Sequence, residues 1–157
     1  MNWRDLFEYR DGNLYWKIKP SARVSIGDKA GVLDKHNGYI RVGYKNKDFR
    51  VHRIIFFMHY GYMPTEIDHI NNIRTDNRIE NLRAATSTQN KYNVSITIAN
   101  TSGVKNVSWN KQKQKWWVRL RVNGKICHFG YFANLELAAL RAAEVRGKYH
   151  GGFARGE

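Results

Sequence analysis

The sequence predicts an α+β protein in which short antiparallel strands are joined by tight turns. Turn signals at Asp11-Gly12-Asn13, His36-Asn37-Gly38 and Asn123-Gly124 separate alternating segments that are typical of β-hairpins. An apolar helical stretch spans residues 51–60, and a second helix follows the last predicted strands at residues 135–149. These observations indicate hairpins and a helix in the first half of the chain, and a three-stranded sheet packed on one helix in the second.

The composition limits both size and chemistry. A length of 157 residues allows one modest core or two small ones. The single cysteine, Cys127, excludes an intrachain disulfide and a cysteine-based zinc site, which suits a reducing cytoplasm. The first residues carry no apolar signal-peptide segment, and no apolar run approaches a membrane span. We therefore expect a soluble, cytoplasmic protein without a membrane partner.

Basic residues are concentrated at the two ends of the chain, whose formal net charge is +14. Residues 1–62 hold 12 Lys and Arg against 6 Asp and Glu, and residues 101–157 hold 11 against 3. Residues 63–100 hold 4 against 4. Basic flanks around a neutral centre are expected if the flanks bind a polyanion and the centre holds a cation on a carboxylate. Solubility alone is the simpler explanation, but the accompanying 5 Trp, 9 Tyr and 7 Phe favour nucleic acid as the partner.

The first 51 residues are predicted to form strands and turns. Residues 30–33 pair with residues 39–43 across the second turn. Basic residues lie on or near these strands, and two roles stay open for them: contact with phosphate, or a solvated sheet edge that opposes aggregation. They are Arg41, Lys45, Lys47 and Arg50.

A buried helix is predicted over residues 51–60, closed by Gly61 with Pro64 beyond it. Its apolar side chains are expected to build the main core against the strands. The expected core residues are Ile54, Ile55, Phe57, Met58 and Tyr60.

The most informative stretch spans residues 66–92, predicted as strand, loop, short strand and helix. Asp68 and His69 are adjacent on the first strand. The carboxylate is a hard ligand for a divalent cation, and the imidazole can take up a proton near neutral pH. This order of elements would fold Asn90 back over the Asp-His pair.

The loop after His69 is rich in turn formers. Asp76, Asn77 and Glu80 are expected to hold it together through hydrogen bonds from side chain to backbone. The helix that follows is expected to be capped by Thr86 or Ser87.

The spacing of these residues resembles the HNH nuclease motif of phage and intron-encoded enzymes, since His69 and Asn81 are twelve positions apart and Asn81 and Asn90 are nine apart. In that family's ββα-metal fold, the residue before the first histidine and the last His or Asn hold one divalent metal. The resemblance implies that Asp68 and Asn90 hold the metal, that His69 is the general base, and that Asn81 orients the His69 ring. Amide oxygen is a harder ligand than imidazole, so the implied cofactor is one Mg²⁺ or Mn²⁺ ion per site rather than Zn²⁺.

An isolated Asp-His pair would be better explained as a turn residue beside a core histidine, but the complete spaced set favours the nuclease motif. His52 and Arg53 lie at the start of the helix predicted over residues 51–60, and two roles stay open for them. They either face the scissile phosphate or the DNA, or they cap and stabilise the start of that helix. In the loop and the strand after it, further candidates for contacts to the DNA backbone are Arg74, Arg78 and Arg83.

Residues 1–92 are predicted to form the first domain, residues 93–102 a polar linker, and residues 103–157 a second domain. Alternation and turn signals define the elements of the second domain. They are strands over residues 104–109, 115–122 and 125–129 and a helix over residues 135–149, capped by Asn134.

The core of the second domain is expected between this helix and one face of the sheet. Apolar side chains alternate along the middle strand and recur along the helix. They are Trp116, Val118, Leu120 and Val122 on the strand, and Leu135, Ala138, Ala142 and Val145 on the helix.

Three strands and a packing helix, with the pattern Ser-Gly-Val…Trp…Gly-Tyr-Phe, resemble the AP2 domain, a DNA-binding module often attached to phage HNH nucleases. In that family the outer sheet face enters the major groove. Ser108 and Asn110 stand where plant members have Arg, so no target sequence can be transferred. A solvated sheet face is the alternative, but it leaves Trp117 unexplained. By position, the resemblance implies DNA contacts from Lys105, Ser108, Asn110, Trp117, Arg119, Arg121 and His128.

Together the two resemblances imply a metal-dependent HNH endonuclease that hydrolyses a phosphodiester of double-stranded DNA. Cleavage is expected to be site-specific, as in homing enzymes. If the protein is phage-encoded, it is expected to act in the cytoplasm of the host cell. One metal and one base cut one strand, so nicking by a monomer is expected and a double-strand break requires a homodimer or a second event. The alternative is a sequence-specific DNA-binding regulator with a vestigial nuclease core. A protein that only binds DNA has no physical need for the complete set of Asp68, His69, Asn81 and Asn90. RNA cleavage is disfavoured because A-form RNA hides the groove that such a sheet reads.

Overall fold

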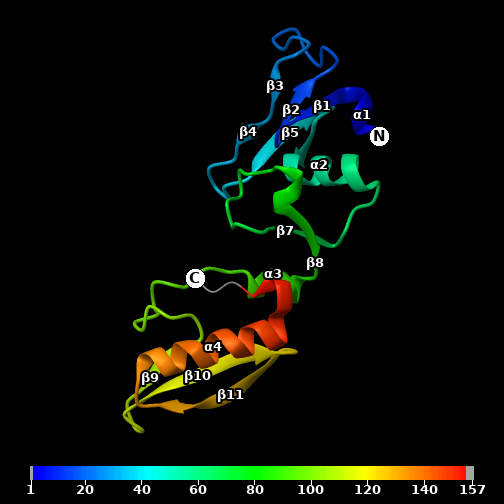
Figure 1. The fold of residues 1–157 in the computed structure, drawn as a ribbon. Helices are drawn as coiled ribbons and strands as arrows, with labels where there is room; N and C mark the ends of the chain where they lie inside the picture. The colour runs from blue at the N-terminus through cyan, green and yellow to red at the C-terminus, as the bar shows by residue number, and fades with distance from the viewer. Residues whose placement is uncertain (1, 155–157) are drawn as a thin grey trace. The chain divides into compact units, whose positions relative to one another are not determined.

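The computed structural model describes residues 2–154 and has the mixed α+β character predicted from the sequence. The chain forms two compact units, Met1–Ala85 and Thr86–Glu157. Figure 1 shows the elements of each. Within the described residues, none of the helices combines the length and apolar character needed to cross a bilayer.

The first unit contains two small three-stranded antiparallel sheets. A short helix, α1 (Trp3–Leu6), precedes them. Their strands are β1 (Phe7–Arg10), β2 (Asn13–Trp16) and β3 (Lys29–Ala30) in one sheet, and β4 (Val32–Leu33), β5 (Ile40–Tyr44) and β6 (Lys47–Arg50) in the other.

Tight turns set the register of these strands. Asp11 and Gly12 join β1 to β2 with φ angles of 41° and 79°, as a two-residue hairpin turn requires. The predicted pairing across the second turn signal is confirmed for two residues, because Val32 lies opposite Arg41 and Leu33 lies opposite Ile40. The prediction was wrong for Ala30, which lies opposite Leu14 in the other sheet.

The predicted helix is confirmed as α2 (Val51–Tyr60), which ends at Gly61 with a left-handed φ of 74°. Ile54, Ile55 and Met58 lie in the core of this unit, together with Leu14 and Leu82. Residues of the two sheets and of α2 therefore share one apolar interior.

Two of the expected core residues of α2 are placed differently. Phe57 is only partly buried and Tyr60 is 53% exposed, whereas the neighbouring Phe56 is 2% exposed. The rings of Tyr60 and Tyr62 pack on Phe56, with centroids 4.6 and 5.6 Å away. Tyr60 therefore covers a buried aromatic ring instead of being buried itself.

After α2 the chain forms a two-stranded antiparallel hairpin, as predicted. Its strands are β7 (Glu66–His69) and β8 (Leu82–Ala85), and a single 3-10 turn, η1 (Ile79–Asn81), leads into β8. Ile67 and Leu82 are buried in the core of the unit. This anchoring fixes which side chains of the hairpin lie next to α2.

The second unit begins with α3 (Ser87–Tyr92), whose start carries a complete capping box between Thr86 and Gln89. Turns then lead to an antiparallel sheet in the order β9-β10-β11, with α4 packed against β10 and β11 (Figure 1). The elements are β9 (Val107–Asn110), β10 (Lys115–Val122), β11 (Lys125–Phe132), α4 (Leu135–His150) and the 3-10 turn η2 (Gly151–Phe153).

The predicted core of the second unit is confirmed. Val118 and Leu120 of β10 and Ala138, Ala142 and Val145 of α4 are at most 2% exposed. Partly buried residues that pack around them include Trp116, Val122 and Leu135.

The compact units divide the chain earlier than the domain boundaries expected at residues 92 and 102. The helix α3 belongs to the second unit. Tyr92 at its end stacks on His150, with ring centroids 3.5 Å apart, and the Lys105 ammonium donates to the carbonyls of Tyr92 and Val94. These contacts explain why α3 and the following segment join the carboxy-terminal sheet and helix.

Candidate active site

The first unit holds the Asp-His pair on β7, close to buried residues of α2. His69 is 4% exposed and lies opposite Leu82 in the hairpin register. Asp68 is 3% exposed and lies opposite Arg83. Two adjacent polar side chains buried at the end of a short strand require specific partners.

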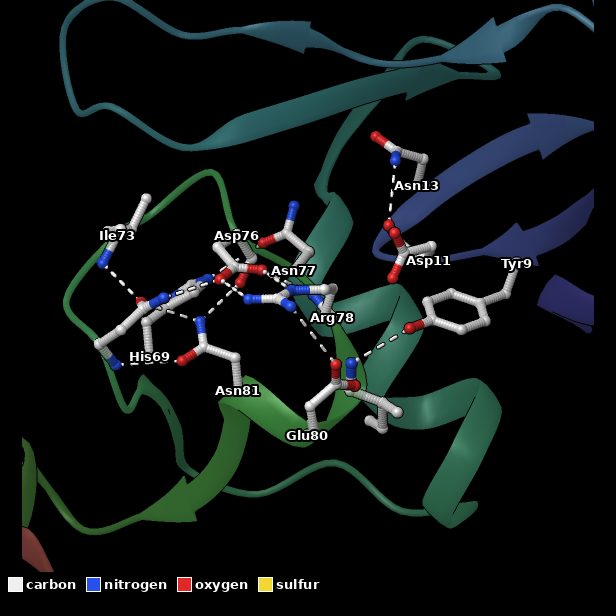
Figure 2. Close-up of polar contacts among 12 residues, drawn as sticks. Tyr9, Asp11, Asn13, His69, Ile73, Asp76, Asn77, Arg78, Glu80 and Asn81 are labelled. Carbon is white, nitrogen blue, oxygen red and sulfur yellow. Dashed lines mark hydrogen bonds and ion pairs between the residues drawn. The ribbon is translucent and has the colours of Figure 1, made fainter.

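The partner of the His69 ring is Asn77. Nε2 of His69 lies 3.0 Å from Oδ1 of Asn77, whose side chain is 1% exposed (Figure 2). Because a carbonyl oxygen only accepts, this contact makes Nε2 the protonated nitrogen, and Nδ1 then carries the lone pair that can accept a proton.

Asn81, expected to orient the ring, instead holds the loop. Its Nδ2 donates to Oδ1 of Asn71 and to the carbonyl of Asp76, and its Oδ1 accepts from the N–H of Asn71. These bonds fix the path of the residues that precede Asn77. A direct role for Asn81 at the His69 ring stays a prediction.

Asp76 ties the same loop together (Figure 2). Its carboxylate accepts from Arg78 through two nitrogens at 2.8 Å and from Nδ2 of Asn71 at 2.7 Å. The Arg78 guanidinium holds the pKa of Asp76 well below its usual range, so the carboxylate stays ionised. The expected hydrogen bond between the Asp76 side chain and backbone is also present, because Oδ1 of Asp76 accepts from the N–H of Arg78 at 3.4 Å.

The hairpin β1–β2 supports this loop from the other side. The Tyr9 hydroxyl accepts from the N–H of Ile79 at 3.1 Å. A Cβ atom placed on Gly12 would lie 2.8 Å from the backbone nitrogen of Arg78 and 3.1 Å from the carbonyl carbon of Asn77. The turn therefore packs directly on the backbone that presents Asn77 to His69.

The environment of His69 favours its neutral form. Burial lowers its pKa, and the charge of Arg74 adds to this effect. The hydrogen bond to Asn77 and the carboxylates of Asp68 and Asp76 act in the opposite direction without cancelling it. A neutral imidazole is the form that can take a proton from water.

His52 of α2 lies beside His69. Their ring centroids are 5.1 Å apart at an interplanar angle of 72°, and the Tyr39 ring lies 5.0 Å from His52 and 5.9 Å from His69. His52 is 3% exposed, and its Nδ1 has no hydrogen-bond partner among the described residues. Burial, followed by the proximity of His69, lowers the pKa of His52 to about 3.

The carboxylate of Asp68 is compensated by Arg83. Nε and Nη2 of Arg83 both lie 2.7 Å from Oδ2 of Asp68. Arg83, expected as a contact to DNA backbone, thus serves in this structure as the counter-ion of the predicted metal ligand.

The donor chemistry of the predicted ligands fits a hard cation. The described residues include no cluster of three or more His, Cys, Asp or Glu side chains. Mg²⁺ needs no such cluster, because it is commonly bound through one or two carboxylates, water and substrate phosphate. Asp68 is the carboxylate among the predicted ligands, and its Oδ2 already accepts from Arg83. Asn90, the second expected ligand, lies on α3 of the other unit.

The other basic candidates near the hairpin have different surroundings. Arg78 is paired with Asp76, and Arg53 donates to the carbonyl of Pro64 at 3.2 Å. Arg74 donates to the carbonyl of Asn37 at 2.8 Å and is exposed.

On the second unit, the predicted DNA-binding face carries a row of stacked rings. Trp117 stacks on His128, with centroids 4.9 Å apart, and on Tyr131 at 5.3 Å. The Arg119 guanidinium lies 4.2 Å from the centre of the Trp117 ring and donates to Ser108 Oγ at 3.3 Å. Four of the seven predicted contact residues therefore lie together.

The remaining three of those residues have local roles in the structure. Lys105 bonds to the backbone after α3, as described above. Arg121 donates to the carbonyl of Gly124 in the hairpin turn, and Asn110 Oδ1 accepts from the N–H of Lys113.

Sequence reasoning did not assign Asn77 to His69, and it gave no role to Tyr39 or Tyr131. Asn77 carried a signal, because it belongs to the series of polar residues between His69 and Asn90. Tyr131 belongs to the Gly-Tyr-Phe of the AP2-like pattern, whereas Tyr39 carried no signal beyond its place next to a turn.

Comparison with known proteins identifies the family. Residues 49–92 match the profile of the HNH endonuclease family. Protein 3.8 of Escherichia phage T7 is 35% identical over 89 residues, which make up 57% of this chain and 73% of the phage protein. The Uncharacterized HNH endonuclease L560 of Acanthamoeba polyphaga mimivirus is 35% identical over 100 residues, or 59% of this chain and 52% of that protein. The chain thus spans about half the length of the mimivirus protein.

No solved structure is significantly similar to the chain. The matched residues 49–92 contain Asp68, His69 and Asn77, whose geometry is described above, together with Asn81 and Asn90. Residues 49–92 of the chain therefore belong to the HNH endonuclease family.

Proposed function

We propose that this protein is a divalent-metal-dependent endonuclease that hydrolyses a phosphodiester bond of double-stranded DNA, and that it nicks one strand at a preferred site. The observation that carries the proposal is the buried His69, bonded to Asn77 and adjacent to Asp68, inside the residues that match the HNH endonuclease family.

In the proposed reaction, His69 takes a proton at Nδ1 from the water that attacks phosphorus. Asn77 keeps the opposite nitrogen protonated and the ring oriented. His69 is 4% exposed, so little of the imidazole contacts bulk water.

The proposed ligand of the cation in the first unit is the carboxylate of Asp68, and Asn90 stays a second ligand predicted from the sequence. When bound, one Mg²⁺ or Mn²⁺ ion would supply Lewis-acid stabilisation of the negative charge that develops on the phosphate. Arg83 keeps the Asp68 side chain aligned along the hairpin.

We assign DNA recognition to the outer face of the β9-β10-β11 sheet, as an AP2-like module would use it. Trp117, Arg119 and His128 form a preorganised row in which stacked rings and a guanidinium restrict one another. A rigid aromatic and cationic row suits insertion into a DNA groove. The net charge of +14 supports a polyanionic partner.

The test for catalysis uses supercoiled plasmid, Mg²⁺ or Mn²⁺, an EDTA control and the variant His69→Ala. We expect conversion to open circles that EDTA abolishes and that His69→Ala slows by about 10²- to 10⁴-fold. The matched control is His36→Ala, in an exposed turn. Full cleavage by His69→Ala would refute the assignment of the base, and a linear product would indicate a dimer.

The test for recognition is a gel-shift titration with the same DNA in EDTA. Trp117→Ala should weaken binding by about 10-fold or more, because it removes the ring that holds Arg119 in place. Trp109→Ala removes an exposed tryptophan that packs on Trp116 instead, and should bind nearly as the wild type does. Tight binding without cleavage in any divalent metal would instead favour a DNA-binding regulator.

A further inference from the structure

Two arginines from distant parts of the first unit meet at the ring of Tyr39. The guanidinium carbon of Arg50 lies 4.7 Å from the ring centre and that of Arg74 lies 5.1 Å from it. Arg50 ends β6, and Arg74 lies in the loop between β7 and η1, where the carbonyl of Asn37 holds it. The aromatic ring restricts both guanidinium groups without neutralising them.

The same ring contacts the proposed base. His69 lies 5.9 Å from the Tyr39 ring centre, and His52 lies 5.0 Å from it. Tyr39 is therefore the shared neighbour of two cationic groups and of the histidine that is to activate water.

These two arginines differ from their neighbours in charge pairing. Arg41 is paired with Asp48, Arg78 with Asp76, and Arg83 with Asp68. Within residues 2–154, no carboxylate is paired with Arg50 or Arg74.

The hollow beside Arg50 and Tyr39 also contains Asp34 and Asp48. Both carboxylates are engaged locally: Asp34 accepts from Asn37 Nδ2 and from the N–H of His36, and Asp48 accepts from Arg41. They therefore do not neutralise the pair on Tyr39.

The start of α2 adds to this positive potential. No side chain of the described residues caps it, and no acidic residue lies in its first turn. The first N–H groups of a helix carry a partial positive charge and favour an anion. Arg50 stands immediately before them.

We propose that Arg50 and Arg74, held on Tyr39, form the binding site for the phosphodiester group on which His69 acts. This proposal rests on the proposed nuclease function and names the residues that place the substrate. Guanidinium groups bind phosphate oxygens through two parallel N–H bonds, and neither of these two guanidinium groups is neutralised by a carboxylate.

The distances suit the chemistry. A base reaches its water through one hydrogen bond, and that water attacks phosphorus from about 3 Å, so the phosphate lies roughly 6 Å from the imidazole nitrogen. A phosphate bound by these guanidinium groups would lie beside the Tyr39 ring, whose centre is 5.9 Å from that of His69.

The first experiment measures binding without catalysis. Full-length protein in EDTA is titrated with the dinucleotide TpT while the Nε–H signals of arginine are followed by NMR. We expect saturable shifts of Arg50 and Arg74, with no shift of Arg10, which is paired with Glu8. The uncharged methylphosphonate analogue of TpT should leave all three unchanged. Unmoved Arg50 and Arg74 signals, or equal shifts with the analogue, would overturn the proposal.

The second experiment measures cleavage by Arg50→Gln and Arg74→Gln beside the control Arg10→Gln. We expect kcat/KM to fall by about 10²-fold or more in the first two variants and to stay at the wild-type value in the control. Wild-type kcat/KM in both variants would overturn the phosphate site. If TpT shifts both arginines but the wild type cleaves no DNA with any divalent metal, the phosphate site stands and the nuclease function fails.

Discussion

The Tyr9 hydroxyl accepts a hydrogen bond from the N–H of Ile79, a residue 70 positions further along the chain. This contact joins the first hairpin to the segment that follows Asn77. The hairpin therefore belongs to the support of the active site, although it contributes no reacting group.

Removing this hydroxyl should loosen the loop. Tyr9→Phe leaves the N–H of Ile79 without its acceptor, and we expect a loss of about 1–3 kcal/mol in the free energy of unfolding. Urea denaturation followed by circular dichroism measures it. Tyr62→Phe, at a ring that is 52% exposed, is the control and should change stability by less than about 0.5 kcal/mol. Equal midpoints for the two variants would contradict a supporting role for Tyr9.

Gly12 offers a sharper test of the same support. Gly12 and Gly27 both have positive φ angles, 79° and 88°, so alanine strains the backbone at either position. Only at Gly12 would the new Cβ approach backbone, 2.8 Å from the nitrogen of Arg78, whereas at Gly27 it meets nothing within 4 Å. We expect Gly12→Ala to cost about 1–3 kcal/mol more than Gly27→Ala. Similar unfolding midpoints would show that the turn does not press on the loop.

Asn77→Ala should show whether Asn77 orients the ring of the proposed base, His69, independently of any effect on folding. It removes the acceptor of Nε2, so the His69 ring loses its preferred tautomer, and we expect kcat to fall about 10- to 100-fold with KM nearly unchanged. Long-range ¹⁵N NMR of His69 should show the Nε2-protonated tautomer in the wild type and a mixture in the variant. Asn13→Ala, on the neighbouring hairpin, is the matched control. An unchanged tautomer in Asn77→Ala would contradict the assignment.

His52 makes stability depend on pH. Its pKa is about 3 in the folded protein and near 6.5 in an unfolded chain, so the unfolded state binds the proton first as the pH falls. The stabilisation that results from this difference in pKa is complete above pH 6.5. It is lost between pH 6.5 and pH 3, where the free energy of unfolding falls by up to about 1.4 kcal/mol per pH unit. His52→Gln should flatten this part of the stability curve measured by urea denaturation, whereas His36→Gln at an exposed turn should not. Parallel curves for wild type and His52→Gln would refute the linkage.

Features encoded by neighbouring residues were predictable from the sequence. Val51 to Gly61 contains both the apolar pattern of α2 and the glycine that ends it, and Thr86 with Gln89 forms the complete cap of α3. The position of the Asp-His pair at the end of a short strand followed from its apolar neighbours in the same way. Each of these signals lies within a few residues of the structure that it specifies.

The choice between Asn77 and Asn81 as the partner of His69 could not be made in this way. Both are amides near the end of one loop, and residue type does not distinguish them. What separates them is the path of the loop, which Tyr9 and Gly12 fix from outside the motif. The burial of Phe56 instead of Tyr60 has a similar cause, because the covering ring of Tyr62 lies beyond the helix.

The pairing of Asp68 with Arg83 determines whether the first unit needs a bound cation in order to fold. A buried carboxylate without a counter-charge would cost several kcal/mol, so a site that relied on its metal for neutrality would fold only after capturing the ion. Here the charge is balanced from within the hairpin. The first unit is therefore expected to fold without the proposed cation, because Arg83 already balances the charge of Asp68.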